Sequence, residues 1–113
     1  MDKAYRISVN IPVGMEQEFM DSVNEVMEPL YPGYDRCFCW WIVHGTWRPL
    51  DGSDPYQGRI GEIEEADEIR IEFAVRENDL ENVIERISGI HPYEEPAIDV
   101  IPMIPWKSLI GSS

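Results

Sequence analysis

The segment with the clearest chemical potential is His91-Pro92-Tyr93-Glu94-Glu95-Pro96. Imidazole titrates near neutral pH and a nearby carboxylate can orient it, so His91 with Glu94 or Glu95 could bind a divalent metal or exchange protons. A metal site normally needs three or four converging ligands, and fewer are evident in this segment. The alternative is a rigid turn, held extended by its prolines, in which Glu94 or His91 satisfies backbone groups or joins subunits.

A second segment, residues 45–58, combines glycines with one arginine and two aromatic residues. Arg48 could hold an anionic ligand through two parallel hydrogen bonds, while Trp47 or Tyr56 could stack on a flat one. The alternative is that Arg48 pairs with a local carboxylate and the aromatics pack on a neighbouring subunit. The candidates for ligand binding or for an interface are Trp47, Arg48, Asp51, Ser53, Tyr56, His91, Tyr93, Glu94 and Glu95.

The cysteines form a third candidate, because Cys37, Cys39 and His44 are ligand types for soft metals. Their spacing lacks the two-residue turn of structural zinc sites, and a second Cys or His pair is missing, so a buried or interface position is favoured. The sequence contains no Walker loop, dinucleotide fingerprint or nucleophile elbow. No complete catalytic centre is therefore predicted.

These segments connect elements whose types follow from periodicity. Alternating apolar residues predict strands over 5–11, 37–43, 69–75 and 97–104, and steps of three and four predict helices over 15–30 and 80–90. Gly89 is expected to end the second helix. The order predicts an α+β fold, a ferredoxin-like βαββαβ sandwich with two helices on one face of an antiparallel sheet. We expect a single domain over 1–105, with a long loop at 45–65 and a short tail at 106–113.

This topology makes the first and third strands central and the second and fourth strands edges. The central strands would carry polar residues away from the helices, at Arg6, Ser8, Asn10, Arg70 and Glu72. The second strand is instead apolar on both faces, which is an aggregation hazard unless another molecule or segment covers it. We therefore expect a homo-oligomer, preferably a trimer, or a loop after Gly45 that folds back over Trp40 and Trp41. The residues assigned to this oligomer edge are Cys37, Phe38, Cys39, Trp40, Trp41 and Ile42.

The charge balance restricts the partners. With 22 acidic against 9 basic residues, the formal net charge is -13, which repels phosphate backbones and anionic lipid head groups. Nucleic acid and membrane are not expected partners. No segment approaches the length of about 20 apolar residues that spans a bilayer, and a cytoplasmic location is expected.

Together, residues 45–58 and 91–97 resemble the paired signatures of YqfO-type proteins and of the domain inserted in many Nif-three-like proteins. The similarity covers about residues 4–103. It implies a fold related to the nitrogen-regulatory PII proteins and the CutA divalent-cation-tolerance proteins, which are ferredoxin-like trimers. In the larger relatives a separate core domain supplies the ligands of a dinuclear metal centre. The histidines here are only His44 and His91, so a metallohydrolase activity is not expected to transfer whole from those relatives.

The function expected from sequence is a non-enzymatic, self-associating sensor or ligand-binding module of the PII/CutA-like type, with no certain cofactor. The first alternative is a divalent-metal-binding protein that uses His91 and nearby carboxylates. The second is a hydrolase-like enzyme with His91 as base and Arg48 as the anion-binding residue, which requires these two residues to converge.

Overall fold

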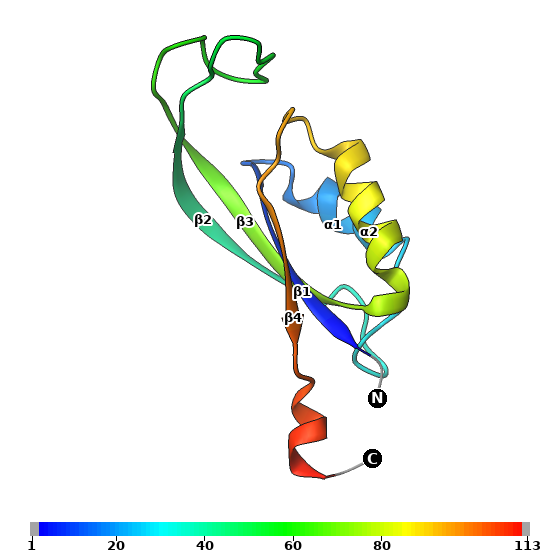
Figure 1. The fold of residues 1–113 in the computed structure, drawn as a ribbon. Coiled ribbons are helices and arrows are strands. Elements are labelled where there is room, and N and C mark those ends of the chain that lie inside the picture. The colour runs from blue at the N-terminus through cyan, green and yellow to red at the C-terminus, as the bar shows by residue number, and fades with distance from the viewer. Residues whose placement is uncertain (1–2, 112–113) are drawn as a thin grey trace.

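The protein folds as a four-stranded antiparallel sheet with two helices packed on one face (Figure 1). This computed structural model describes residues 3–111. The elements in chain order are β1 (Ala4–Pro12), α1 (Glu16–Asn24), β2 (Phe38–Trp47), β3 (Glu64–Arg76), α2 (Glu77–Ile90), β4 (Ile98–Met103) and the 3-10 helix η1 (Trp106–Ile110). The predicted βαββαβ ferredoxin-like arrangement is confirmed.

The strands lie in the order β2-β3-β1-β4, so β2 and β4 are the edges, as predicted. Within the sheet, β1 pairs with β3 from Ala4 opposite Arg76 to Pro12 opposite Glu68. On its other side β1 pairs with β4, and Ala4 lies directly opposite Met103. Pro102 is accommodated because β4 is an edge strand that needs hydrogen bonds on one side only.

The core lies between the sheet and the helices. Alternate residues of β1 and β3 point toward the helices, which contribute apolar residues at helical spacing. The most deeply buried of these side chains are Ile7, Val9, Ile11, Val23, Ile71, Phe73, Val75, Val83 and Ile87. The period-two and 3.6-residue patterns of the sequence therefore correspond to one continuous core.

The opposite face of the sheet carries a polar network on the two central strands, as predicted. The Ser8 hydroxyl donates a hydrogen bond of 2.5 Å to Glu72, and Arg6 pairs with the same carboxylate at 3.2 Å. These two partners, Ser8 foremost, hold the pKa of Glu72 below its usual value against the opposing effect of desolvation. Arg70 donates a further hydrogen bond to Asn10 at 2.9 Å.

Two helix boundaries differ from the sequence-based expectation. The first helix ends at Asn24, although Val26 and Met27 still pack against the core from the following turn. Because these two residues are apolar and follow the helical spacing, the sequence pattern predicted a helix that extends beyond its actual end. Gly89 lies inside α2, which runs to Ile90, because this glycine does not adopt the left-handed backbone angles that terminate many helices.

The β2–β3 hairpin is longer than expected and projects beyond the helices (Figure 1). Cross-strand pairing extends to Trp47 opposite Glu64, so the irregular loop covers only residues 48–63 instead of 45–65. The C-terminal segment projects from the other end of the sheet, and the molecule measures 54 × 25 × 24 Å. Among residues 3–111, neither helix is long and apolar enough to cross a membrane.

Candidate ligand-binding groove

The structure brings together the two segments singled out by their composition, residues 45–58 and 91–97. The Glu94 carboxylate accepts a hydrogen bond from the backbone N–H of Asp54, at 3.0 and 3.2 Å to its two oxygens. This contact joins residues 40 positions apart. The loop of the hairpin is therefore fastened to the connector between α2 and β4.

Aromatic packing reinforces the same contact. The Tyr93 ring lies 5.7 Å from the Tyr56 ring and 6.5 Å from the Trp47 ring, centroid to centroid, with tilted geometry in both pairs. Such pairs add about 0.5–1.5 kcal/mol beyond the area that they bury. The aromatics of the loop thus pack against the connector within this chain.

The loop itself is ordered by main-chain contacts. The N–H of Gly61 donates to the Pro49 carbonyl at 2.7 Å, and the Trp47 indole N–H donates to the Gln57 carbonyl at 3.2 Å. These bonds close the base of the loop and keep the Trp47 ring turned toward Tyr93. A loop of 16 residues that is fixed in this way is a typical location for a binding site.

Between the loop and the connector lies a groove of about 530 Å³. This volume is in the range of small-molecule sites. Arg48 lines the groove, and no ion pair with another described residue engages its guanidinium, contrary to the alternative that pairs it with a local carboxylate. The lining residues are Asn10, Gly45, Thr46, Trp47, Arg48, Pro49, Leu50, Ser53, Pro55, Tyr56, Gln57, Glu68, Tyr93, Glu94, Glu95 and Ala97.

His91 lies beneath the groove with both ring nitrogens engaged. Its Nε2 lies 2.6 Å from the Asn10 carbonyl oxygen, and its Nδ1 accepts a hydrogen bond from the Tyr93 N–H at 3.2 Å. This pattern is that of a neutral imidazole protonated on Nε2. Burial lowers the pKa of His91, opposed by the Asn10 hydrogen bond and the charge of Glu68. A metal ion or a transferred proton would have to displace one of these bonds.

Glu68 forms part of the floor of the groove and is only 6% exposed. Its carboxylate occupies space that only a glycine leaves free, because a Cβ on Gly45 would lie 2.3 Å from Oε1. Burial raises the pKa of the Tyr93 hydroxyl to about 12, and the charge of Glu68 and a hydrogen bond with its carboxylate contribute further. Glu68, Gly45 and Tyr93 therefore form one closely packed unit.

The predicted site residues are mostly, but not all, in the groove. Trp47, Arg48, Ser53, Tyr56, Tyr93, Glu94 and Glu95 line it; His91 lies below it and Asp51 is exposed in a turn outside the lining. The groove also includes two residues that were not predicted as site residues, Asn10 and Glu68, which come from the strands. The only feature of the sequence that indicates the position of Glu68 is its spacing of two and four residues from Arg70 and Glu72, which places it on the same face of β3.

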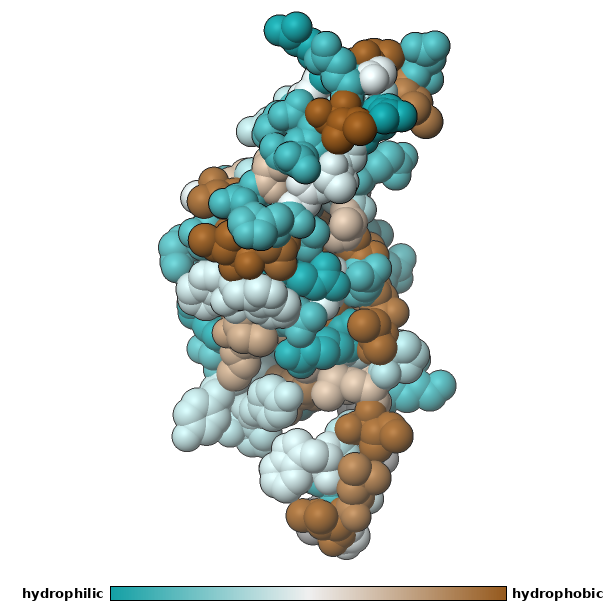
Figure 2. All heavy atoms as spheres, turned by 90° about the vertical axis from the view of Figure 1, so that its left-hand side faces the viewer, coloured by the Kyte–Doolittle hydropathy of each residue, from teal (hydrophilic) through white to brown (hydrophobic). Residues whose placement is uncertain are grey.

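No segment within residues 3–111 covers the edge strand β2. Trp40 and Trp41 are each 44% exposed and Ile42 is 58% exposed, so the loop does not fold back over them; it packs on the connector instead. Figure 2 faces this side of the molecule and shows brown and pale residues reaching the surface between hydrophilic ones. Phe38 points inward and packs 5.0 Å from Phe73, whereas Cys37 and Cys39 are exposed free thiols.

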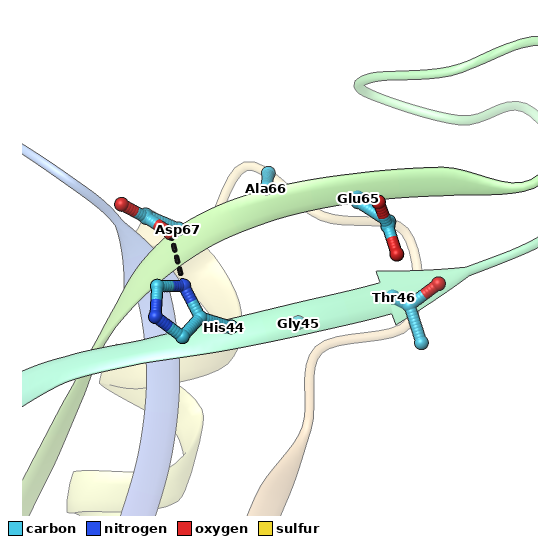
Figure 3. Close-up of a pocket in the computed structure, with 6 residues that line it drawn as sticks. All are labelled: His44, Gly45, Thr46, Glu65, Ala66 and Asp67. Atoms are coloured by element: carbon cyan, nitrogen blue, oxygen red, sulfur yellow. Dashed lines mark hydrogen bonds and ion pairs between the residues drawn. The ribbon is translucent and has the colours of Figure 1, made fainter.

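A different, polar hollow lies on the other face of the hairpin (Figure 3). His44 Nδ1 lies 2.5 Å from Asp67 Oδ1 across the two strands, with Thr46 and Glu65 beside this pair. The His44 side chain is 90% exposed, so the pair is solvated and the thiols do not join it. Among residues 3–111, no cluster of three metal-ligating side chains is present.

Comparison with known proteins agrees with this fold. Residues 58–108 match the family model of the CutA1 divalent ion tolerance protein. A protein called GTP cyclohydrolase 1 type 2 homolog from Staphylococcus epidermidis is 35% identical over 99 residues, which cover 88% of this chain and 27% of that protein. A Bacillus cereus protein related to NIF3 superposes with a TM-score of 0.78 at 26% identity, over 92% of this chain and 26% of that chain. This chain is a PII/CutA-like domain related to the NIF3 proteins.

The PII/CutA-like domain spans about a quarter of the length of the curated relatives that it matches. Its fold also occurs by itself: the PII-like protein CutA from Nostoc superposes with a TM-score of 0.59 at 19% identity, over 92% of this chain and 84% of that one. The resemblance identified from residues 45–58 and 91–97 is therefore confirmed. These two segments form the groove.

Proposed function

We propose that this PII/CutA-like domain is a self-associating ligand-binding module without a catalytic centre of its own, acting in the cytoplasm. The observation that carries the binding role is the convergence of both motif segments on one groove of about 530 Å³. The groove has a rigid aromatic wall and an arginine without an ion-pair partner among the described residues. The activity in the name of the curated relatives is not proposed, because this chain matches only 27% of such a protein.

Self-association is supported by how much surface the chain exposes. A compact monomer of 13.1 kDa is expected to expose about 6,400 Å², whereas this chain exposes 7405 Å². Its radius of gyration is 16.1 Å, against about 13 Å for a compact domain of this length. The excess is comparable to the share of about 800 Å² that one partner contributes to a standard interface. The exposed aromatics of β2 are suited to supply it.

Sedimentation tests this assembly. We expect a mass near three times the 13.1 kDa of one chain, and we expect Trp40→Lys to lower it, because a charge on an edge strand opposes pairing. Val13→Lys is the matched control, since Val13 is also an exposed apolar residue but lies outside the sheet edges. A wild-type monomer at high concentration would refute the self-association.

Binding at the groove is tested with a fragment library that contains anionic, cationic and neutral compounds in equal number. We expect binders to shift the NMR signal of the Trp47 indole N–H, which lies at the groove. The Trp41 indole, on the exposed face of β2, is the internal control. If no compound of any charge moves the Trp47 signal, the binding role fails.

The two alternatives both depend on His91. A metal site at His91 and Glu94, or a base at His91, requires the imidazole to give up the Asn10 or Tyr93 hydrogen bond. Metal analysis of protein purified without an affinity tag, compared with His91→Ala, tests the metal-binding alternative. Stoichiometric metal in the wild type that is lost in the variant would favour the metal-binding alternative over the ligand-binding module.

A further inference from the structure

The groove contains a buried acidic side chain that has no cationic partner among the described residues. Glu68 is 6% exposed, and within residues 3–111 no lysine, arginine or histidine forms an ion pair with it. Below it lies His91, whose hydrogen bonds are those of a neutral imidazole, and beside it the Tyr93 hydroxyl supplies one uncharged donor. Burial of an unpaired charge is costly, and a bound cation is one way to balance an ionised carboxylate in such a place.

The walls above this carboxylate are aromatic. Trp47 and Tyr56 flank Tyr93 at centroid distances of 6.5 and 5.7 Å, and all three line the groove. Aromatic faces attract cations, and clusters of them recognise alkylated ammonium groups. Glu94 and Glu95 line the same groove, and the whole chain carries a net charge of -13. The aromatic rings and the negative charge therefore both favour a cationic ligand.

We propose that the groove binds a small organic ammonium ion, with its cationic group between the aromatic rings and above Glu68. This inference rests on the proposed ligand-binding role and specifies its ligand class. Inorganic divalent cations fit less well, because they need several converging oxygen ligands, and no three metal-ligating side chains converge among residues 3–111. Arg48, also in the lining and without an ion pair among the described residues, would contact an anionic group at the other end of a zwitterionic ligand.

The first experiment compares choline with 3,3-dimethylbutan-1-ol, which has the same shape without the charge, by calorimetry and by the Trp47 NMR signal. We expect choline to bind at least about tenfold more tightly, since a desolvated cation–π contact contributes about 2 kcal/mol. Glycine betaine, which adds a carboxylate, should bind more tightly than choline to the wild type and equally to Arg48→Gln. Equal or better binding of the neutral alcohol would overturn the proposal.

Variants of the floor and wall give an independent test. Glu68→Gln keeps the shape and removes the charge, so choline affinity should fall at least about tenfold while Tm stays equal or rises. Glu65→Gln removes the same charge from the other face of the hairpin and should change affinity less than about twofold. A lower Tm of Glu68→Gln with unchanged choline binding would show a purely structural carboxylate and refute the inference.

Tyr56→Leu keeps a large apolar side chain at a position that is 59% exposed, so it leaves the fold intact while it removes one aromatic face. We expect it to weaken choline binding, and an unchanged affinity would contradict the role of the rings. If the fragment library yields anionic or neutral binders at Trp47 but no cationic ones, the ligand class is wrong and the binding role stands. If it yields none, both fail.

Discussion

The close approach of Gly45 to Glu68 predicts that Gly45→Ala is strongly unfavourable. The added Cβ would lie 2.3 Å from Glu68 Oε1 and 3.2 Å from its Cδ, about 1 Å inside normal contact. Glu68 is buried between the strands and the groove, so its carboxylate has little free space to enter. Overpacking of this kind costs about 1–3 kcal/mol, and the lower entropy of the unfolded alanine chain offsets about 0.4–1 kcal/mol of that.

The net loss should therefore be about 1–2 kcal/mol in the free energy of unfolding, or roughly 4–8 °C in Tm. Urea unfolding of a double-mutant cycle locates its origin. Combining Gly45→Ala with Glu68→Ala should recover most of the loss, because the clashing atoms are gone, whereas Glu68→Gln should not, because it has the same shape.

Gly89→Ala is the matched control. Gly89 lies within α2, and apart from its chain neighbours and the backbone of its own helix, no atom of residues 3–111 is within 4 Å of its added Cβ. The substitution should therefore stabilise the protein by about 0.5–1 kcal/mol. The steric argument would be refuted if Gly45→Ala were as stable as the wild type, or if Glu68→Ala and Glu68→Gln rescued it equally.

The remaining predictions concern pH. Ser8→Ala removes the main cause of the lowered Glu72 pKa, and it should cost about 1–2 kcal/mol at neutral pH. A carboxyl group whose pKa is lowered in the folded state stabilises the fold at pH values above its ordinary pKa of 4.5. The stability deficit of Ser8→Ala should therefore shrink as the pH falls below 4.5. An equal deficit at neutral pH and below 4.5 would contradict the argument. The lowered pKa of His91 predicts that wild-type stability falls as pH drops below 6.5, because the unfolded chain then binds a proton that the folded one excludes. His91→Gln should abolish this slope.

The sheet and its core were predictable because burial imposes a period on the sequence. Ile7, Val9 and Ile11 alternate with polar residues, and the polar ones do face away from the helices. The extension of the hairpin was not predictable, because beyond Val43 both strands leave the helices and lose the apolar face that marks a strand. Residues 45–47 and 64–66 are strand only because their backbones pair across the hairpin. Backbone pairing does not depend on residue type, so the amino-acid composition of these segments does not reveal it.

The candidate site was predictable as two segments and not as one groove. Composition identified Arg48 and Tyr93, but the contact between Asp54 and Glu94 depends on how far the hairpin projects. His91 was misleading for a physical reason: an imidazole in a polar segment suggests chemistry, and here both of its nitrogens satisfy backbone groups. Glu68 was not predicted because it is one of 22 acidic residues in the sequence. Only its burial distinguishes it from the others, and burial is visible only in the structure.

The pairing of Ala4 with Met103 gives the fold a modular character. The first and last strands are neighbours, so the backbone enters and leaves the sheet with Cα atoms only about 5 Å apart. A longer polypeptide can therefore interrupt one of its own surface loops with this domain and resume almost where it stopped, without rearranging the host. Closely spaced ends of this kind suit a domain whose matching region makes up 27% of a longer relative.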